Sequence, residues 1–314
     1  MQYPWGGKEP FYTYHQYLHN TFGFQIRKLP VDAGFTCPNR DGTVGLGGCT
    51  FCLNEAFAPG YCDCRHSIAQ QVNDGIAFHA QRRRPIDKFF IYFQSFSNTH
   101  APLEQLKKKF EEAITIPDVK GIIVATRPDC LSEKVLDYLS ELQKRTYLCV
   151  EIGIESLHDE TLQRINRGHD VACTLQATKA LAERSIPTSG HLIFGLPGET
   201  PEDWMRDTQA INNLPLSTIK LHQLQILRGT PISLEHETCP HDFHHFSATE
   251  YIAFLADFIE RLSPEIAIER LANEVPPRYL AEREWKGIRH QDIVDGVCQL
   301  LQKRHSWQGE KRRL

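Results

Sequence analysis

The chain has 314 residues, of which 41% are hydrophobic, 10% aromatic and 24% charged. This length and composition suffice for a large globular core, which excludes global disorder and a small disulfide-stapled scaffold. The formal net charge of −4 gives no overall positive field that would attract a polyanion. The first twenty residues lack the pattern of a signal peptide, and no apolar run approaches the roughly 20 residues of a membrane helix. We therefore expect a cytoplasmic protein without a membrane partner.

Short apolar segments rich in β-forming residues alternate with helical patterns along most of the chain. Such alternation is typical of β-α units that build a parallel sheet. The predicted strands cover residues 31–36, 89–95, 121–127, 147–156, 188–196 and 218–227. Six units of this kind predict an α/β fold, a partial (β/α)6 parallel barrel, with its chemistry at the carboxyl ends of the strands.

The regular alternation ends near residue 227. A polar, histidine-rich segment follows, then a helix predicted over residues 251–262, a short strand over 266–269 and a final helical segment. We therefore expect an N-terminal segment (1–28), a partial-barrel core (29–232) and a small C-terminal α/β appendage (233–314).

Three of the ten cysteines follow the first predicted strand: Cys37, Cys49 and Cys52, with gaps of eleven and then two residues. Thiolates are soft metal ligands, and a C-x-x-C pair can bring two sulfur atoms to one metal centre. Structural zinc sites and ordinary iron–sulfur clusters have four protein ligands. A set of three therefore suggests a coordination position left open for a reactive group.

The chain here resembles the radical S-adenosylmethionine (SAM) superfamily, and within it the YhcC/YtqA-like group, which is related to Elongator-type and coproporphyrinogen-dehydrogenase-type enzymes. The resemblance covers most of the chain and rests on the segments GFTCPNRDGTVGLGGCTFC, TRPDCL, VEIGIES, RINRGHD, HLIFGLPGET and IKLHQLQILRGTP. The first cysteine gap departs from the superfamily's usual C-x3-C-x2-C spacing and is a mark of this group.

The resemblance implies a [4Fe-4S] cluster held by Cys37, Cys49 and Cys52, with SAM bound to the remaining iron. Reductive cleavage of SAM would then yield a 5′-deoxyadenosyl radical that abstracts hydrogen from a substrate, while the protein orients the reactants and excludes side reactions. The electron would come from a reductant such as flavodoxin or ferredoxin.

The same resemblance points to SAM contacts at the strand ends. Phe51 would border the adenine, and the turn with Ser97 and Asn98 stands where relatives have a glycine-rich turn for the methionyl end of SAM. The other expected contacts are Thr126, Arg127, Glu155, Arg167, His191 and Gly195. Arg167 matches the arginine that pairs with the SAM carboxylate, and Glu155 is better suited to the ribose hydroxyls, because a carboxylate repels a carboxylate.

Several of these assignments have plainer alternatives. Ser97 and Asn98 could simply form an Asx-type turn, and Arg167 could be a solvated charge at a helix end. His191 is also expected as a catalytic residue, but it could be a satisfied core residue. Lys220 and His222 lie two residues apart on one strand face, which suggests catalytic or substrate contacts, although surface polar positions are the competing interpretation.

The substrate is the least determined part of the prediction. Relatives that act on tRNA favour a tRNA partner and wobble-uridine modification. Basic triplets at residues 82–84, 107–109 and 311–313 are compatible with RNA, although such triplets are usually solvated helix faces. A small metabolite is the alternative substrate. A non-catalytic zinc or cluster-containing binding module is the alternative class, with the missing zinc ligand supplied by Cys62, Cys64 or His66.

Overall fold

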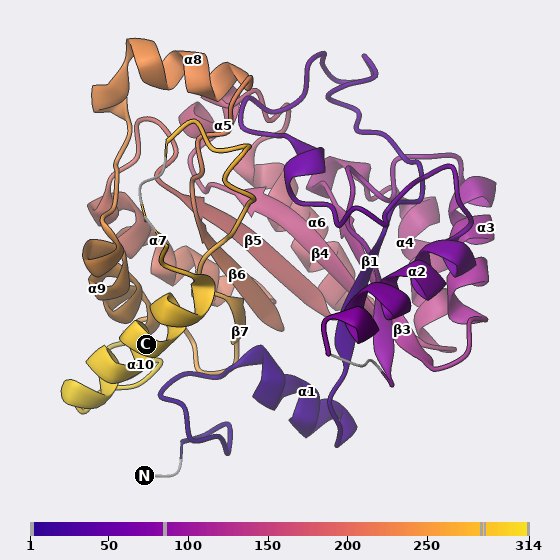
Figure 1. Ribbon diagram of the computed structural model, residues 1–314, viewed down its shortest axis with the longest axis horizontal. Helices are drawn as coiled ribbons and strands as arrows, with labels where there is room; N and C mark the ends of the chain where they lie inside the picture. Colours follow the sequence, from indigo (N-terminus) through magenta and orange to yellow (C-terminus); the bar gives the residue numbers. More distant parts are fainter. Residues whose placement is uncertain (1–2, 84–86, 283–284, 286, 313–314) are drawn as a thin grey trace.

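The structure is a computed structural model that describes residues 3–83, 87–282, 285 and 287–312. Its centre is a seven-stranded parallel sheet in which the strands lie side by side in chain order (Figure 1). The strands are β1(Arg27–Val31), β2(Phe89–Phe93), β3(Val119–Thr126), β4(Tyr147–Glu155), β5(Thr188–Phe194), β6(Thr218–Gln223) and β7(Ala267–Arg270). The sheet curves into a half-barrel, which confirms the α/β partial barrel predicted from the sequence.

Helices pack around the sheet; those that follow β2, β3 and β4, such as α3, α4 and α6, cover its outer face, and α1 lies across one end (Figure 1). The helices are α1(Tyr14–Phe22), α2(Ile68–Gln81), α3(Leu103–Ile114), α4(Glu133–Gln143), α5(Asp159–Arg164), α6(Val171–Glu183), α7(Pro201–Asn213), α8(Pro231–Thr238), α9(Ala248–Ile259) and α10(His290–Lys303). Their apolar stripes form the main core; in α3, for example, Leu106, Phe110 and Ala113 are fully buried. The pattern of three- and four-residue spacing thus fixes which face of each helix meets the sheet.

The first strand lies earlier in the chain than the sequence pattern predicts. Residues 31–36 were expected to form it, but β1 ends at Val31 and residues 32–36 form a loop. The Gln71 side chain takes the place of a neighbouring strand as hydrogen-bond partner of the backbone here. It accepts a hydrogen bond from the Asp32 amide at 2.8 Å and donates one to the Asp32 carbonyl at 2.8 Å. The alternation at Val31, Ala33 and Phe35 reflects burial against the helices, not strand pairing.

The short strand predicted near residue 266 does not lie apart from the barrel. It forms β7, which pairs in parallel with β6 and extends the sheet to seven strands. The division into a core and an appendage therefore stays a prediction, but the two parts share one sheet.

Helix α1 covers the amino-terminal end of the half-barrel (Figure 1). Leu18 is buried against Phe90 and Tyr92 inside the sheet, and the Tyr17 and Tyr147 hydroxyls lie 3.3 Å apart. Thr13 forms a parallel bridge with Ile268 of β7. The half-barrel is thus closed at this end, and access to its interior is from the opposite, carboxyl end of the strands.

None of the helices in the described part of the chain is both long and apolar enough to cross a membrane. The cytoplasmic location stays a prediction.

Candidate functional site

A cavity of about 760 Å³ lies inside the half-barrel at the carboxyl ends of the strands. Its lining comes from β1 through β7, from the cysteine loop after β1 and from the segment after β7. Of the residues predicted from the sequence, the cavity brings together Cys37, Cys49, Phe51, Cys52, Thr126, Arg127, Glu155, Arg167, His191, Lys220 and His222.

All three cysteines of the predicted cluster site line this cavity as free thiols. The Cys52 amide donates to the Cys49 carbonyl at 3.0 Å, which folds the C-x-x-C segment into a turn. Burial, with a contribution from Cys49, raises the pKa of the Cys52 thiol. The loop is anchored by Asn166, whose amide donates to the Gly48 carbonyl at 2.8 Å.

The three thiols are donors of the kind that an iron–sulfur cluster uses. In the described ranges, no three His, Cys, Asp or Glu side chains gather tightly enough to hold one metal ion. A cluster makes a different demand, because each cysteine binds its own iron atom and the sulfur atoms need not converge. Arg167 also donates from Nη1 to Cys49 Sγ at 3.4 Å, an interaction that stabilises a thiolate.

Glu155 and Arg167 form a buried pair at the end of β4. Arg167 Nη2 lies 3.3 Å from Glu155 Oε1 and donates to the Gly153 carbonyl at 2.7 Å. The register between β4 and β5 shifts between Gly153 and Glu155, and Glu155 has a φ of +63°. Such a conformation is costly for a non-glycine residue and is concentrated at functional sites.

The pair also leaves polar atoms without a protein partner. Glu155 Oε2 and Arg167 Nε are buried and make no hydrogen bond within the described chain, and the same holds for Arg127 Nη1. A carboxylate acceptor and two guanidinium donors, all from residues that line the cavity, are of the types that bind the hydroxyl and carboxylate groups of SAM. The residues present therefore fit SAM, and Arg167 is not a solvated helix-end charge, since only 6% of its surface is exposed.

The predicted turn at residues 97–99 lies behind the cavity wall and not in the cavity lining. Ser97 and Asn98 are fully buried and are not part of the cavity lining. The Asn98 amide donates to the carbonyls of Phe93, Ser95 and Ala125 at 2.9–3.0 Å. The turn therefore fixes the ends of β2 and β3 from behind.

Thr126 and Arg127 follow this turn and line the cavity. The Thr126 hydroxyl is 2.9 Å from Ser97 Oγ and 2.6 Å from Thr99 Oγ1. Two nitrogens of the Arg127 guanidinium bind the Asp129 carboxylate at 2.8 and 2.6 Å. A bidentate pair of this kind fixes the plane of the guanidinium, so the free Nη1 is held in one orientation.

His191 and His222 meet inside the cavity, with ring centroids 4.2 Å apart. They come from neighbouring strands, since Ile193 of β5 is in register with His222 of β6. Burial lowers the pKa of both rings, most strongly for His222. The pair is therefore a neutral donor and acceptor group at physiological pH.

Lys220 belongs to a buried charge network below this pair. Its ammonium is 2.7 Å from both oxygens of Glu151 and 3.3 Å from Glu269 Oε1. Lys28 bridges the same two carboxylates, at 3.5 and 2.5 Å. Two lysines thus balance two glutamates, and the Tyr92 hydroxyl donates to Glu151 at 2.5 Å. This arrangement makes Lys220 part of the cavity floor.

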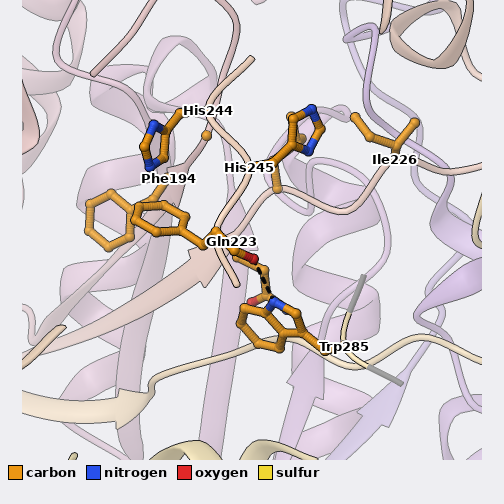
Figure 2. A pocket seen from close by; sticks show the side chains of 9 residues that line it. Phe194, Gln223, Ile226, His244, His245 and Trp285 are labelled. Carbon is orange, nitrogen blue, oxygen red and sulfur yellow. Dashed lines mark hydrogen bonds between the residues drawn. The ribbon is translucent and has the colours of Figure 1, made fainter. Parts of the chain in front are cut away.

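Gly195, predicted to contact the cofactor, lies beside a second and much smaller cavity of about 10 Å³, shown in Figure 2. Its φ is +96°, and a Cβ atom there would lie 3.1 Å from the His244 carbonyl. The Trp285 indole donates to the Phe246 carbonyl at 2.8 Å beside it. Gly195 therefore allows close packing of the 244–246 segment and is not among the residues that line the large cavity.

Sequence reasoning missed several residues of the large cavity. Gln94 and Phe96 line it where Ser97 and Asn98 were expected, and Arg270 and Asn273 line it from the segment treated as an appendage. Glu151, in the quoted VEIGIES segment, could have been found from its alternation with Glu155 along one strand. No sequence pattern pointed to Arg270, because a register shift between β6 and β7 brings this residue to the cavity.

Comparison with known proteins agrees with this geometry. Residues 37–211, more than half of the chain, match the Radical SAM superfamily, and residues 216–299 match the Radical_SAM C-terminal domain. The chain belongs to the radical SAM superfamily. It is an enzyme of this superfamily and falls in a YhcC-like group.

Two relatives define that group. The chain is 35% identical over 309 residues to YtqA of Bacillus subtilis (strain 168), which covers 98% of this chain and 95% of the relative. It is 34% identical over 277 residues to YhcC of Escherichia coli (strain K12), with 86% and 87% covered. The solved structure of an archaeal Methanocaldococcus infernus Elp3 has the same fold, with a TM-score of 0.66, 17% identity and coverage of 90% of this chain and 64% of that one.

Proposed function

We propose that this radical SAM enzyme holds a [4Fe-4S] cluster through Cys37, Cys49 and Cys52 and cleaves SAM reductively to abstract hydrogen from a substrate in the same cavity. The observation that carries the proposal is the shared cavity, which is lined by the three cysteines and by residues whose buried polar atoms lack a protein partner. When bound, the cluster and SAM supply an adenosyl radical, the chemistry that the protein itself cannot provide.

The chain's own residues bind and orient these groups. Arg167 donates to Cys49 Sγ and lies 3.3 Å from Glu155 Oε1, so its guanidinium is held in one orientation and its Nε stays without a protein partner. Arg127 Nη1 would be a second donor, and Glu155 Oε2 would accept a hydrogen bond from a ribose hydroxyl of bound SAM. The buried network below Lys220 and helix α1 keep water out of the closed end of the barrel. Exclusion of water limits the side reactions of a radical.

The decisive experiment is anaerobic reconstitution with iron and sulfide, followed by incubation with SAM and a strong reductant. We expect about four irons per chain, because the proposed cluster has that composition, and formation of 5′-deoxyadenosine. Flavodoxin or ferredoxin is the proposed physiological reductant and is tested in place of the chemical one. A colourless protein that holds one zinc ion would instead support the non-catalytic alternative.

Cys52→Ala tests the ligand assignment. This variant should lose the visible absorption of the cluster and all 5′-deoxyadenosine formation, because a thiolate ligand is removed from the site. Cys64→Ala is the matched control: Cys64 is exposed and lies outside the cavity lining, so cluster content and SAM cleavage should match the wild type. Full SAM cleavage by Cys52→Ala would show that the assignment is wrong.

We propose tRNA as the substrate class, with modification of the wobble uridine as the reaction and a small metabolite as the alternative. The support is a relative named tRNA uridine(34) acetyltransferase from Dehalococcoides mccartyi (strain CBDB1), 25% identical over 203 residues, 62% of this chain and 42% of that protein. The surface offers Arg82, Arg83 and Lys108 as exposed cations; Arg84 and Arg313 of the basic triplets lie outside the described residues.

Two measurements test the substrate class. Binding of tRNA should weaken steeply as salt rises, because counterions are released when phosphates are neutralised. Nucleosides of tRNA from cells with and without the gene should differ at one modified uridine. Unchanged nucleosides together with undetectable tRNA binding would favour the small metabolite.

A further inference from the structure

One wall of the large cavity carries basic and imidazole side chains that the SAM-binding residues do not use. It is formed by the end of β6, by β7 and by residues 271–274. The inference drawn from this wall rests on the proposed function, since it concerns the substrate of the same cavity.

A β-bulge directs Arg270 into the cavity. Ile219 of β6 pairs with Ile268, but the next residue, Lys220, pairs with Arg270, so Glu269 is an extra residue in β7. In a regular strand, consecutive side chains point to opposite faces, yet Glu269 and Arg270 both line the cavity. Bulges are frequent beside active sites, where they redirect a side chain. The bulge thus lets Glu269 join the charge network of Lys28, Lys220 and Glu151 on the cavity floor, called the floor network below, while Arg270 lines the wall.

Arg270 has no carboxylate within ion-pair distance among the described residues, whereas the other acidic groups of the cavity are engaged. Glu151 and Glu269 bind the lysines Lys28 and Lys220, and Glu155 binds Arg167. Glu274, which also lines the cavity, accepts a hydrogen bond from the His290 amide. The hydrogen bond of the Arg270 guanidinium is a 3.4 Å contact from Nη1 to Asn273 Oδ1. The guanidinium therefore keeps most of its donors for a ligand.

His222 stands on the same wall with both ring nitrogens unused. It is 4% exposed, and neither nitrogen has a hydrogen-bond partner in the described part of the chain. Burial, supported by the nearby charges of His191 and Arg270, holds the pKa of His222 well below its usual value. A neutral imidazole offers one N–H donor and one acceptor. An unpaired buried polar group of this kind costs free energy unless a ligand completes it.

The wall is held rigidly. Gln223 donates to the Asn273 carbonyl at 3.1 Å and accepts from the Asn273 amide at 3.0 Å. His290 accepts from the Leu271 amide at 3.3 Å, which ties the first residue of α10 to the same segment. These hydrogen bonds fix the backbone that follows Arg270, while the Arg270 side chain itself is exposed at the cavity wall.

We propose that Arg270 and His222 form the substrate-binding subsite of this cavity and that it takes an oxyanion, a phosphate or carboxylate group of the substrate. Guanidinium forks match both groups in geometry and charge, and the neutral His222 adds one N–H donor. The floor network is charge-balanced, so the oxyanion supplies the counter-charge that Arg270 lacks.

The test uses the reconstituted full chain and two probes, inorganic phosphate and acetate, at fixed ionic strength set with chloride. Ligand-observed NMR gives the dissociation constant of each probe for the wild type, Arg270→Gln and His222→Phe. We expect Arg270→Gln to weaken binding at least about tenfold, and His222→Phe to weaken it less. Arg270→Lys, which keeps the charge without the fork, should lie between the wild type and Arg270→Gln.

Arg278→Gln is the matched control, because Arg278 is exposed, stacks on Tyr279 and does not line the cavity. It should bind both probes like the wild type. A preference for phosphate or for acetate identifies the group on the substrate, and either preference supports the subsite. Failure of both probes to bind the wild type, or equal binding by Arg270→Gln and Arg278→Gln, would overturn it.

Formation of 5′-deoxyadenosine by the same wild-type preparation separates the two proposals. Cleavage of SAM without anion binding would refute the subsite and leave the proposed function standing. Anion binding that depends on Arg270, without any SAM cleavage, would refute the proposed function and leave the subsite standing.

Discussion

At the scale of single residues, the pair of Glu155 and Arg167 depends on a missing side chain. A Cβ atom at Gly153 would clash with Glu155 Oε1 and with Arg167 Nη2. Gly153→Ala should therefore force the pair apart and weaken SAM binding by at least about tenfold, or 1.4 kcal/mol. Calorimetry on the anaerobic, reconstituted protein measures this. Gly60→Ala is the control, because a Cβ atom at Gly60 meets nothing within 4 Å.

The sequence could supply only part of this site. The match of Arg167 and Glu155 to family positions placed them near SAM, and both line the cavity. Their mutual contact could not be foreseen, because it depends on a register shift and a positive φ at Glu155. A regular two-residue alternation describes neither feature. Equal SAM affinity of Gly153→Ala and Gly60→Ala would show that the pair does not position the ligand.

The floor network leads to a prediction about acid stability. Burial opposes ionisation of Glu151 and Glu269, but the two lysines outweigh it and hold the pKa of each carboxyl below its usual value. Glu151→Gln leaves excess positive charge in the floor, so we expect the free energy of unfolding at neutral pH to fall by roughly 3–5 kcal/mol. Urea denaturation measures the loss.

The pH dependence of that loss follows from the depressed pKa values. The two ionised carboxylates stabilise the folded protein fully above the unfolded-state pKa of about 4.3, and this stabilisation is lost as pH falls towards their folded-state pKa values. The difference between the wild type and Glu151→Gln should be constant from neutral pH down to about pH 5 and narrow below about pH 4. Glu141→Gln, which breaks an exposed pair with Lys144, should change stability by less than about 1 kcal/mol at any pH. If the difference in unfolding free energy between the wild type and Glu151→Gln did not change with pH, the carboxyls of the floor network would not be ionised in the folded protein.

Among the elements, helix α1 closes the amino-terminal end of the half-barrel by packing on the sheet. Leu18→Ala would leave a hole beside Phe90 and Tyr92, and we expect the free energy of unfolding to fall by about 2–4 kcal/mol. His19→Ala removes the neighbouring, exposed side chain and should cost less than about 0.5 kcal/mol. Equal stability of the two variants in urea would show that α1 does not pack as described.

Element boundaries show where sequence patterns succeed and fail. The strands β2 to β6 lie within or close to their predicted ranges, although β6 ends four residues before its predicted end; β2 is an apolar run, and β6 is buried although it contains Lys220 and His222. The range predicted for β1 was wrong because its sequence, RKLPV, contains two cations and a proline and so does not form an apolar run. Proline in a strand is typical of a sheet edge. Lys28 pairs with the Glu151 and Glu269 carboxylates contributed by β4 and β7 and lies over the Tyr14 and Tyr92 rings, contacts that no local sequence pattern encodes.

At the scale of the whole molecule, the two ends of the chain are joined through one buried side chain. Gln308 is 1% exposed; its amide donates to the carbonyls of Ser263 and Ile266 at 2.6 and 2.8 Å, and its Oε1 accepts from the Tyr12 amide at 2.8 Å. The Gln308 backbone amide donates to the Pro10 carbonyl at 2.9 Å. Residues expected in the N-terminal segment and in the appendage therefore share one hydrogen-bond network across the barrel's closed end.

This network predicts how the molecule unfolds. Gln308→Ala leaves buried carbonyl and amide groups without partners, at a cost of roughly 1–3 kcal/mol. If core and ends form one cooperative unit, aromatic fluorescence and far-ultraviolet circular dichroism should move together to a lower urea midpoint. Gln302→Ala, at an exposed position of α10, should leave both midpoints in place. Two separate transitions in Gln308→Ala would instead show that the C-terminal part folds as an independent appendage, because only the joint between the two parts has been weakened.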